Sequence, residues 1–184
     1  MGDFFISANE LSERMARNAP QRVFDVRRHQ ALEPDSRFIP GSRWRNHIQT
    51  ADWSQGLDRD VPIVLTCMHG HNVSQIAGAR LRELGFESRV LAGGIEDWLE
   101  RQLPSIGQTE LLAFDADRPS QWVTRLGAKI DRVACPWLIR RFIDPDAQFV
   151  FVEPEWVLDV ADELDAIAFD TPGAPIEHDG DRCS

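Results

Sequence analysis

Cysteines, lysines and long apolar runs are scarce in this 184-residue sequence, and each shortage narrows what the protein can be. The three cysteines are far apart and odd in number, which argues against a disulfide framework and for a reducing compartment. No apolar run approaches the ~20 residues that span a bilayer. The first residues also lack the basic start and the apolar core of a signal peptide. We therefore expect a cytoplasmic protein with no membrane contact.

Positive charge is also in short supply, because the net charge is −10 and Lys129 is the only lysine. The imbalance lies late in the chain. Residues 1–106 carry 13 arginines against 14 acidic residues, whereas residues 107–184 carry 7 basic against 16 acidic residues. Nucleic-acid-binding proteins concentrate positive charge, so we expect no nucleic-acid partner. The change of composition near residue 107 suggests a domain boundary.

Strands and helices alternate along the first part of the chain. Ser7 with Glu10 three positions later forms a capping box, which predicts a helix over residues 8–18. Short runs rich in β-forming residues predict strands, and helical spacing of apolar residues predicts further helices. The strands are expected at 22–26, 63–66 and 88–91, and the helices at 73–84 and 95–102. This alternation favours an α/β fold with a mostly parallel sheet and helices on both faces.

The second part of the chain predicts a smaller α/β segment, with strands at 122–124, 149–152 and 166–169 and helices at 136–143 and 154–164. Pro136 would lie in the first turn of its helix, because proline is favoured there, and Cys135 would then stand at the helix start. Trp122, Trp137 and Trp156 are expected to be core aromatic residues.

Cys67 follows the clearest predicted strand and precedes a turn into a helix. Ligands of open α/β sheets bind at this edge. Main-chain amides and the helix dipole there stabilise a thiolate, a bound oxyanion or a persulfide. Gly70 relieves crowding in the tight turn. A buried structural cysteine is the plain alternative, but the combination of strand, cysteine, glycine turn and helix favours a reactive one.

Four segments resemble the successive signatures of single-domain rhodaneses. They occur in the family's order within residues 7–104 and read FDVRR, FIPGSRWRN, VLTCMHGHNVSQIAGARLRELGF and VLAGGIEDW. The resemblance implies a rhodanese-like fold, in which helices flank a parallel five-stranded sheet on both faces. It also implies a sulfurtransferase whose cysteine accepts sulfane sulfur as a persulfide and passes it to a nucleophilic acceptor. We expect no cofactor and no metal.

Each functional residue of the family is carried over only where this sequence matches its motif. Cys67 matches the nucleophile, and Asp25 and Arg27 match the supporting Asp-Val-Arg motif. The matching substrate-binding or anion-binding loop consists of Met68, His69, Gly70, His71, Asn72 and Val73. The Gly-Gly turn and the tryptophan after it are matched by Gly93, Gly94 and Trp98.

The loop departs from the family at Asn72, where sulfurtransferases often carry an arginine. An arginine would bind the thiosulfate sulfonate by paired hydrogen bonds, whereas Asn72 brings no charge. We therefore expect thiosulfate to be a poor donor and a persulfide or another sulfur carrier to be preferred. His69 and His71 either supply part of the missing charge or are plain exposed loop residues. The absence of a phosphate-binding arginine disfavours a phosphatase, and one tight loop seldom holds a metal.

Residues 121–184 resemble the domain of chromate-resistance (ChrB-type) proteins, most densely at KIDRVACPWLIRRFIDPDAQF and HDGDRCS. That domain usually continues beyond the last motif, so we expect this one to be incomplete, with oligomerisation through it as one way to complete it. The candidate site residues here are Cys135, His178 and Cys183, as anion or metal ligands, although a small apolar role is the alternative for Cys135. Five basic residues around Cys135 suit either an oxyanion or ion pairs with neighbouring carboxylates.

The sequence therefore predicts a rhodanese-like domain at 7–106, a linker at 107–120 and a ChrB-type domain at 121–184. The predicted function is a sulfurtransferase that works through a Cys67 persulfide and is linked to chromate or oxidative stress. The expected partners are a small sulfur donor or oxyanion and a thiol or sulfur-carrier acceptor. The alternative is a non-catalytic module that senses an oxyanion or redox state or binds another protein.

Overall fold

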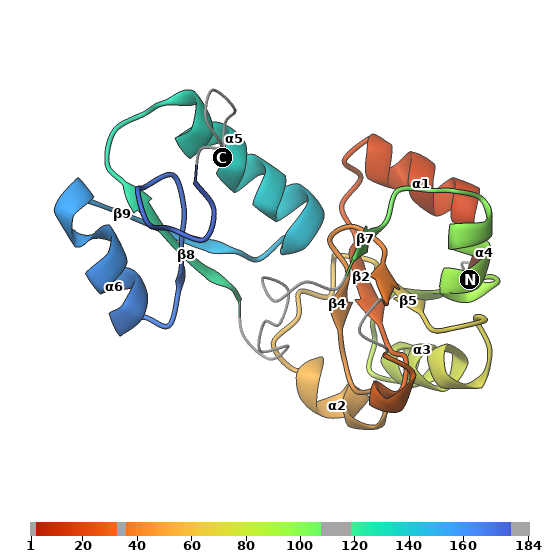
Figure 1. Cartoon of the computed structure of the whole chain (residues 1–184). Helices are drawn as coiled ribbons and strands as arrows, with labels where there is room; N and C mark the ends of the chain where they lie inside the picture. The colour runs from red at the N-terminus through yellow and green to blue at the C-terminus, as the bar shows by residue number, and fades with distance from the viewer. Residues whose placement is uncertain (1–2, 33–35, 108–118, 178–184) are drawn as a thin grey trace. The chain divides into compact units, whose positions relative to one another are not determined.

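The computed structural model describes residues 3–32, 36–107 and 119–177. The chain divides into two compact units, residues 1–108 and 109–184 (Figure 1). Most of the linker predicted at 107–120 lies outside the described residues. Across the three described ranges, every helix is too short or too polar to cross a bilayer.

The first unit is built on a parallel five-stranded sheet in the order β1-β6-β5-β2-β4, as the resemblance implied. Its strands are β1 (Phe5–Ile6), β2 (Arg22–Asp25), β4 (Arg43–Trp44), β5 (Ile63–Thr66) and β6 (Ser88–Leu91). Its helices are α1 (Ala8–Ala16), α2 (Thr50–Trp53), α3 (Asn72–Glu83) and α4 (Gly94–Glu100). A small antiparallel pair joins β3 (Arg37–Phe38) to β7 (Ile106–Gly107). The predicted α/β class is confirmed.

Helices cover both faces of this sheet, with α1 and α4 on one side and α2 and α3 on the other (Figure 1). Successive residues of a strand point to opposite faces, and β5 shows this clearly. Val64 packs in the apolar cluster that contains Leu11 and Trp98, whereas Leu65 packs in the cluster that contains Leu81. All four residues of β5 are buried. The strand that leads to Cys67 is therefore held from both sides.

The capping box and the helix after the cysteine are close to their predicted positions. Ser7 Oγ accepts a hydrogen bond of 3.2 Å from the Glu10 amide at the start of α1. In α3, Ala77 and Leu81 are buried against the sheet as the helical spacing predicts. The helical spacing of the apolar residues in 73–84 places Ile76 on this face as well, but its side chain is 64% exposed, so the spacing is wrong for this residue.

The second unit has a three-stranded parallel sheet in the order β10-β8-β9. Its strands are β8 (Gln121–Arg125), β9 (Gln148–Val152) and β10 (Ile167–Ala168), and its helices are α5 (Ile130–Leu138) and α6 (Val157–Glu163). A π-helical turn, Ile139–Ile143, extends α5, and a 3-10 turn, Pro154–Trp156, precedes α6. Separate apolar clusters lie under α5 and α6, on the two faces of β8.

The prediction for the start of α5 is wrong, because the helix begins at Ile130 and contains Pro136 in its interior. Proline lacks an amide hydrogen, so the carbonyl of Arg132, four residues earlier, loses its usual helical partner. Cys135 therefore lies within a helix rather than at its N-terminus. It is 6% exposed and packs with Trp122 and Phe169. The helix-start stabilisation of a Cys135 thiolate does not apply.

Of the three tryptophans predicted in this core, only Trp122 belongs to it, with a fully buried side chain. Trp137 is 57% exposed and Trp156 is 56% exposed, so the prediction is wrong for both. Trp137 lies on the outer face of α5, two residues after the buried Cys135, and its ring contacts Phe142 edge-on. The unit is too small to bury both faces of its helices.

Candidate functional site

Cys67 directly follows β5, at the carboxyl end of the middle strand of the sheet, and α3 begins five residues later. Its side chain is 5% exposed. The sulfur lies 3.1 Å from Ser74 Oγ and 4.0 Å from the main-chain oxygen of His71. The first amides of an α-helix have no acceptor within the helix, so the start of α3 suits a thiolate or a bound anion beside this cysteine.

The residues after Cys67 are fixed against the start of α4. The amide of Ile95 donates to the Cys67 carbonyl at 2.9 Å, and the amide of Glu96 donates to the Met68 carbonyl at 3.2 Å. At Gly94, which has φ of +63°, a Cβ atom would overlap both of these carbonyl oxygens. The approach of the two backbones therefore requires glycine at this position.

Glycine is also required at Gly70, on the cysteine-loop side of the same backbone contact. Its φ is +71°, and a Cβ atom there would overlap the carbonyl oxygen of Leu91 and approach the amides of Gly93 and Gly94. The side chain of Gln75 donates to the Gly70 carbonyl at 3.0 Å. The cysteine loop and the Gly-Gly turn thus pack backbone to backbone.

The two histidines of the loop have different surroundings. His69 Nδ1 lies 2.7 Å from Glu96 Oε2, and both side chains are 55% exposed. The rings of His69 and His71 are 6.5 Å apart, and His71 is exposed. Asn72 is also exposed, at the first position of α3. A charge on His69 would be balanced by Glu96, so His71 is the better placed of the two histidines to attract an anionic donor.

Asp25 and Arg27 form a buried ion pair at the carboxyl end of β2, next to β5. Arg27 Nε donates to Asp25 Oδ2 at 2.8 Å and Arg27 Nη2 lies 2.6 Å from the same oxygen. The guanidinium also donates to the Arg37 carbonyl and lies over the Phe38 ring. Burial raises the pKa of Asp25, and the charge and hydrogen bonds of Arg27 oppose that shift. The pair fixes the segment that leaves β2, which is a supporting role.

Trp98 is a core residue of α4 rather than part of an open site. Its side chain is 1% exposed, and its indole N–H donates to the Pro104 carbonyl at 2.8 Å. It packs in the apolar cluster with Leu11 and Ile95. Trp98 therefore supports α4, whose first amides hold the cysteine loop.

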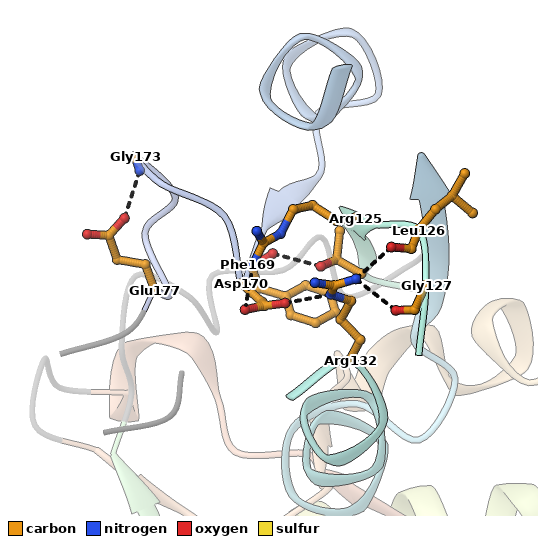
Figure 2. Close-up of polar contacts among 9 residues, drawn as sticks. Arg125, Leu126, Gly127, Arg132, Phe169, Asp170, Gly173 and Glu177 are labelled. Carbon is orange, nitrogen blue, oxygen red and sulfur yellow. Dashed lines mark hydrogen bonds and ion pairs between the residues drawn. The ribbon is translucent and has the colours of Figure 1, made fainter. Parts of the chain in front are cut away.

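In the second unit, two of the clustered arginines pair with a carboxylate (Figure 2). Arg132 Nε lies 2.8 Å from Asp170 Oδ2, and Arg125 Nη2 lies 3.0 Å from Asp170 Oδ1. Arg132 also donates to the carbonyls of Leu126 and Gly127 at 2.6 and 2.8 Å. Burial disfavours the Asp170 carboxylate, but the hydrogen bonds and charges of the two arginines outweigh burial and lower its pKa. Of the two alternatives, ion pairing therefore applies to Arg125 and Arg132.

The second-unit candidates are not brought together by the described part of the structure. Cys135 is buried in an apolar cluster, whereas His178 and Cys183 lie outside the described residues. Among the residues that are described, no three histidine, cysteine or acidic side chains are grouped as a metal site.

Two residues near Cys67 were not identified from the sequence. Ser74 contacts the sulfur from the first turn of α3, and Glu96 pairs with His69 from α4. The sequence feature that could have identified Ser74 is a small polar residue on the inner face of the helix that follows the cysteine. Glu96 is 27 residues from His69, and only the fold brings the two together.

A parallel five-stranded sheet with helices on both faces and a cysteine loop after its middle strand defines an α/β protein of the rhodanese class. The model of the rhodanese-like domain matches residues 7–101, and the chain belongs to this family. The model described as "ChrB, C-terminal domain" matches residues 122–184. The two matches fall in the two compact units.

Curated relatives agree with both matches. Protein ChrB of Cupriavidus metallidurans is 53% identical over 64 residues, which are 35% of this chain and 18% of that protein. The chain therefore spans less than a fifth of the ChrB relative. Thiosulfate sulfurtransferase GlpE of Pseudomonas aeruginosa is 35% identical over 97 residues, covering 48% of this chain and 87% of that protein. GlpE of Stutzerimonas stutzeri is 37% identical over 83 residues, covering 45% of this chain and 73% of that protein.

Solved structures share the fold of the first unit. A full-length protein from Lactobacillus plantarum has a TM-score of 0.52 and 25% identity, covering 57% of this chain and 88% of that chain. A protein from Bacillus halodurans has a TM-score of 0.51 and 23% identity, covering 56% of this chain and 77% of that chain. At this identity, the similarity shows the fold alone.

Proposed function

We propose that the protein is a sulfurtransferase that carries sulfane sulfur as a persulfide on Cys67. The observation that carries this proposal is the position of Cys67 between the middle strand and the start of α3, in the region similar to thiosulfate sulfurtransferases. The amides at a helix start suit a thiolate and the terminal sulfur of a persulfide alike. The compartment that suits this chemistry is a reducing one, such as the cytoplasm, because the cysteine must return to its free form in each cycle.

The reaction has two displacement steps. In the first, the Cys67 thiolate attacks the sulfane sulfur of the donor, forming a new S–S bond. The donor's bond to that sulfur breaks, and its electron pair leaves with sulfite from thiosulfate, or with a thiolate from a persulfide. In the second, a thiolate acceptor attacks the outer sulfur, and the Cys67 thiolate leaves. The protein is neither oxidised nor reduced over the cycle.

The residues around Cys67 favour a donor with little negative charge. Asn72 brings no cation to the loop, and a charge on His69 is balanced by Glu96. His71 and the first amides of α3 are the groups that remain to hold an anion. We therefore propose a small persulfide as the donor and a thiol or a sulfur-carrier protein as the acceptor.

Incubation with a persulfide donor tests the proposal directly. Intact-protein mass spectrometry is expected to show a gain equal to one sulfur atom in the wild type and no gain in Cys67→Ser. A second incubation, with a thiol acceptor, is expected to remove the added sulfur. Cys135→Ser is the matched control and is expected to take up sulfur like the wild type, because Cys135 is buried in another apolar cluster. If the wild type and Cys67→Ser gain the same mass with every donor, the proposed function is wrong.

Replacing Asn72 with arginine is expected to increase the use of thiosulfate. A charge-assisted hydrogen bond to the sulfonate contributes about 1.5–3 kcal/mol, so kcat/KM for thiosulfate should rise about tenfold or more. The rise should be absent with a small alkyl persulfide donor, because such a donor has no sulfonate for the arginine to bind. Initial rates of sulfite release from thiosulfate and of transfer from the persulfide measure the two effects.

Ala79→Arg is the matched control for this substitution. Ala79 is exposed on α3, two turns beyond Asn72, so the variant adds the same charge to the same helix away from the loop. This variant is expected to leave the rates with thiosulfate and with the persulfide donor unchanged. An equal gain in the two variants would mean that general attraction, and not a contact in the loop, is responsible.

One observation favours a second candidate function, a non-catalytic module that senses redox state or an oxyanion. Cys67 is only 5% exposed, and its sulfur already has a partner in Ser74. Together with the ChrB-like second unit, this suits a thiol that responds to chromate or oxidative stress without turnover. The two functions differ in the acceptor step: a sensor would keep its modified cysteine in the presence of thiols, whereas a sulfurtransferase releases the sulfur and accepts another.

A further inference from the structure

A buried hydroxyl lies beside the sulfur of Cys67. Ser74, the third residue of α3, is fully buried, and its Oγ is 3.1 Å from Cys67 Sγ. The same hydroxyl is placed to donate to the main-chain oxygen of His71, also at 3.1 Å. A single hydroxyl therefore contacts both the reactive sulfur and a carbonyl of the loop that surrounds it.

The direction of these hydrogen bonds depends on the charge of the sulfur. A serine hydroxyl has one proton to donate and two lone pairs to accept with. When Cys67 is a thiol, its S–H donates to Ser74 Oγ while the hydroxyl donates to His71. When Cys67 is a thiolate, the sulfur only accepts, and the hydroxyl turns to donate to it. A hydrogen bond to an ionised acceptor is about twice as strong as a neutral one, so the hydroxyl stabilises the thiolate more than the thiol.

Burial makes this donor more important than it would be in water. Cys67 packs in the apolar cluster that contains Phe24, Leu65 and Ala77. An ionised group in apolar surroundings is costly unless it is hydrogen-bonded. Ser74 supplies such a donor from the first turn of α3, on the inner face of the helix.

We propose that Ser74 is a further catalytic residue for sulfur transfer, whose hydroxyl donates to the Cys67 thiolate. This inference rests on the proposed function. The thiolate occurs twice in the cycle, as the nucleophile that takes sulfur from the donor and as the leaving group when the acceptor removes it. In uptake the hydrogen bond raises the fraction of Cys67 that is present as the nucleophilic thiolate, and in release it stabilises the thiolate that leaves.

The test is a pH titration of the thiolate absorbance of the full chain, with the spectrum of Cys67→Ser subtracted to remove the other cysteines. In Ser74→Ala, the midpoint assigned to Cys67 is expected to rise by about one pH unit, the shift that corresponds to losing one hydrogen bond to a charged group. Ser74→Thr keeps the hydroxyl and is expected to return the midpoint toward the wild-type value. Thermal unfolding of each variant reports whether the fold is retained.

Ser88→Ala is the matched control. Ser88 is also fully buried, and its hydroxyl donates to the Gly78 carbonyl of the same helix at 2.8 Å. Removing it deletes a buried hydroxyl that binds α3 without touching the sulfur, so the Cys67 midpoint should stay unchanged. If Ser74→Ala titrates like the wild type, or if Ser88→Ala shifts the midpoint equally, the role assigned to Ser74 is wrong.

The sulfur-uptake experiment separates this proposal from the proposed function. A persulfide on wild-type Cys67 together with an unmoved midpoint in Ser74→Ala would overturn the role of Ser74 and leave the sulfurtransferase intact. A raised midpoint in Ser74→Ala without any persulfide in the wild type would overturn the sulfurtransferase, and with it the catalytic role of Ser74. A raised midpoint together with a persulfide supports both.

Discussion

Replacing Gly94 with alanine is expected to destabilise the first unit by about 2–5 kcal/mol and to abolish sulfur transfer. The added Cβ would overlap the carbonyl oxygens of Cys67 and Met68, which are main-chain atoms that cannot turn aside. The left-handed backbone conformation at Gly94 adds strain for any residue with a side chain. Relief requires the cysteine loop to move off α4, which displaces the sulfur from the start of α3. Denaturant unfolding and the sulfur-uptake assay measure the two effects.

Gly56→Ala is the matched control in the same unit. An alanine Cβ at Gly56 would meet no atom within 4 Å, and the backbone there is outside the left-handed region. The change is expected to be neutral or to stabilise the unit by about 0.4–1 kcal/mol through the entropy of the unfolded chain. If Gly94→Ala transferred sulfur at the wild-type rate, the position of the cysteine loop would not depend on its close contact with α4.

Replacing Asp170 with asparagine is expected to destabilise the second unit by about 3 kcal/mol or more. The variant leaves Arg132, which is 7% exposed, without its carboxylate partner, and a buried unpaired charge is expensive. Asparagine suits this position because the backbone φ of Asp170 is +49°, a conformation that asparagine tolerates. The stability lost in this variant therefore measures the effect of removing the charge and not an effect of backbone strain. Hydrogen exchange of the β8 and β10 amides measures it, with β5 amides as the internal reference.

At acid pH, the difference in the free energy of unfolding between the wild type and Asp170→Asn should become smaller. The arginines lower the pKa of Asp170 in the folded state, so its contribution to stability is complete above the unfolded value of about 4. The contribution is lost as the pH falls through the lower, folded-state pKa. Asp162→Asn changes an exposed carboxylate of α6 and is expected to stay within about 0.5 kcal/mol of the wild type throughout. A difference that does not change with pH would contradict ionisation of Asp170 as the source.

The elements that were predicted well depend on short-range sequence signals. The β5 segment is a short apolar run rich in β-branched residues and bounded by a proline, and both of its ends are where the sequence places them. The start of α1 follows from Ser7 and Glu10, whose contact is local. The position of Cys67 at the strand end and of the glycine turn after it could likewise be deduced from residue order.

The features that were missed depend on tertiary packing. Pro136 is a good first-turn residue, but burial of Cys135 and Ile139 in the α5 cluster with Trp122 outweighs the lost hydrogen bond and extends the helix backwards to Ile130. The pairing of His69 with Glu96 joins the loop between β5 and α3 to helix α4, so no local pattern reports it. The contact of Ser74 with Cys67 depends on how the helix is rotated against the sheet.

The order of strands in the second unit has a consequence for its synthesis. β8 is the first of the three strands in the chain, yet it lies in the middle of the sheet, between β10 and β9. Until residues 148–152 have left the ribosome, both edges of β8 lack their native partners, and one edge stays unpaired until residues 167–168 follow. Exposed strand edges pair readily with other chains, so a nascent chain is most prone to aggregate while β8 waits for its neighbours.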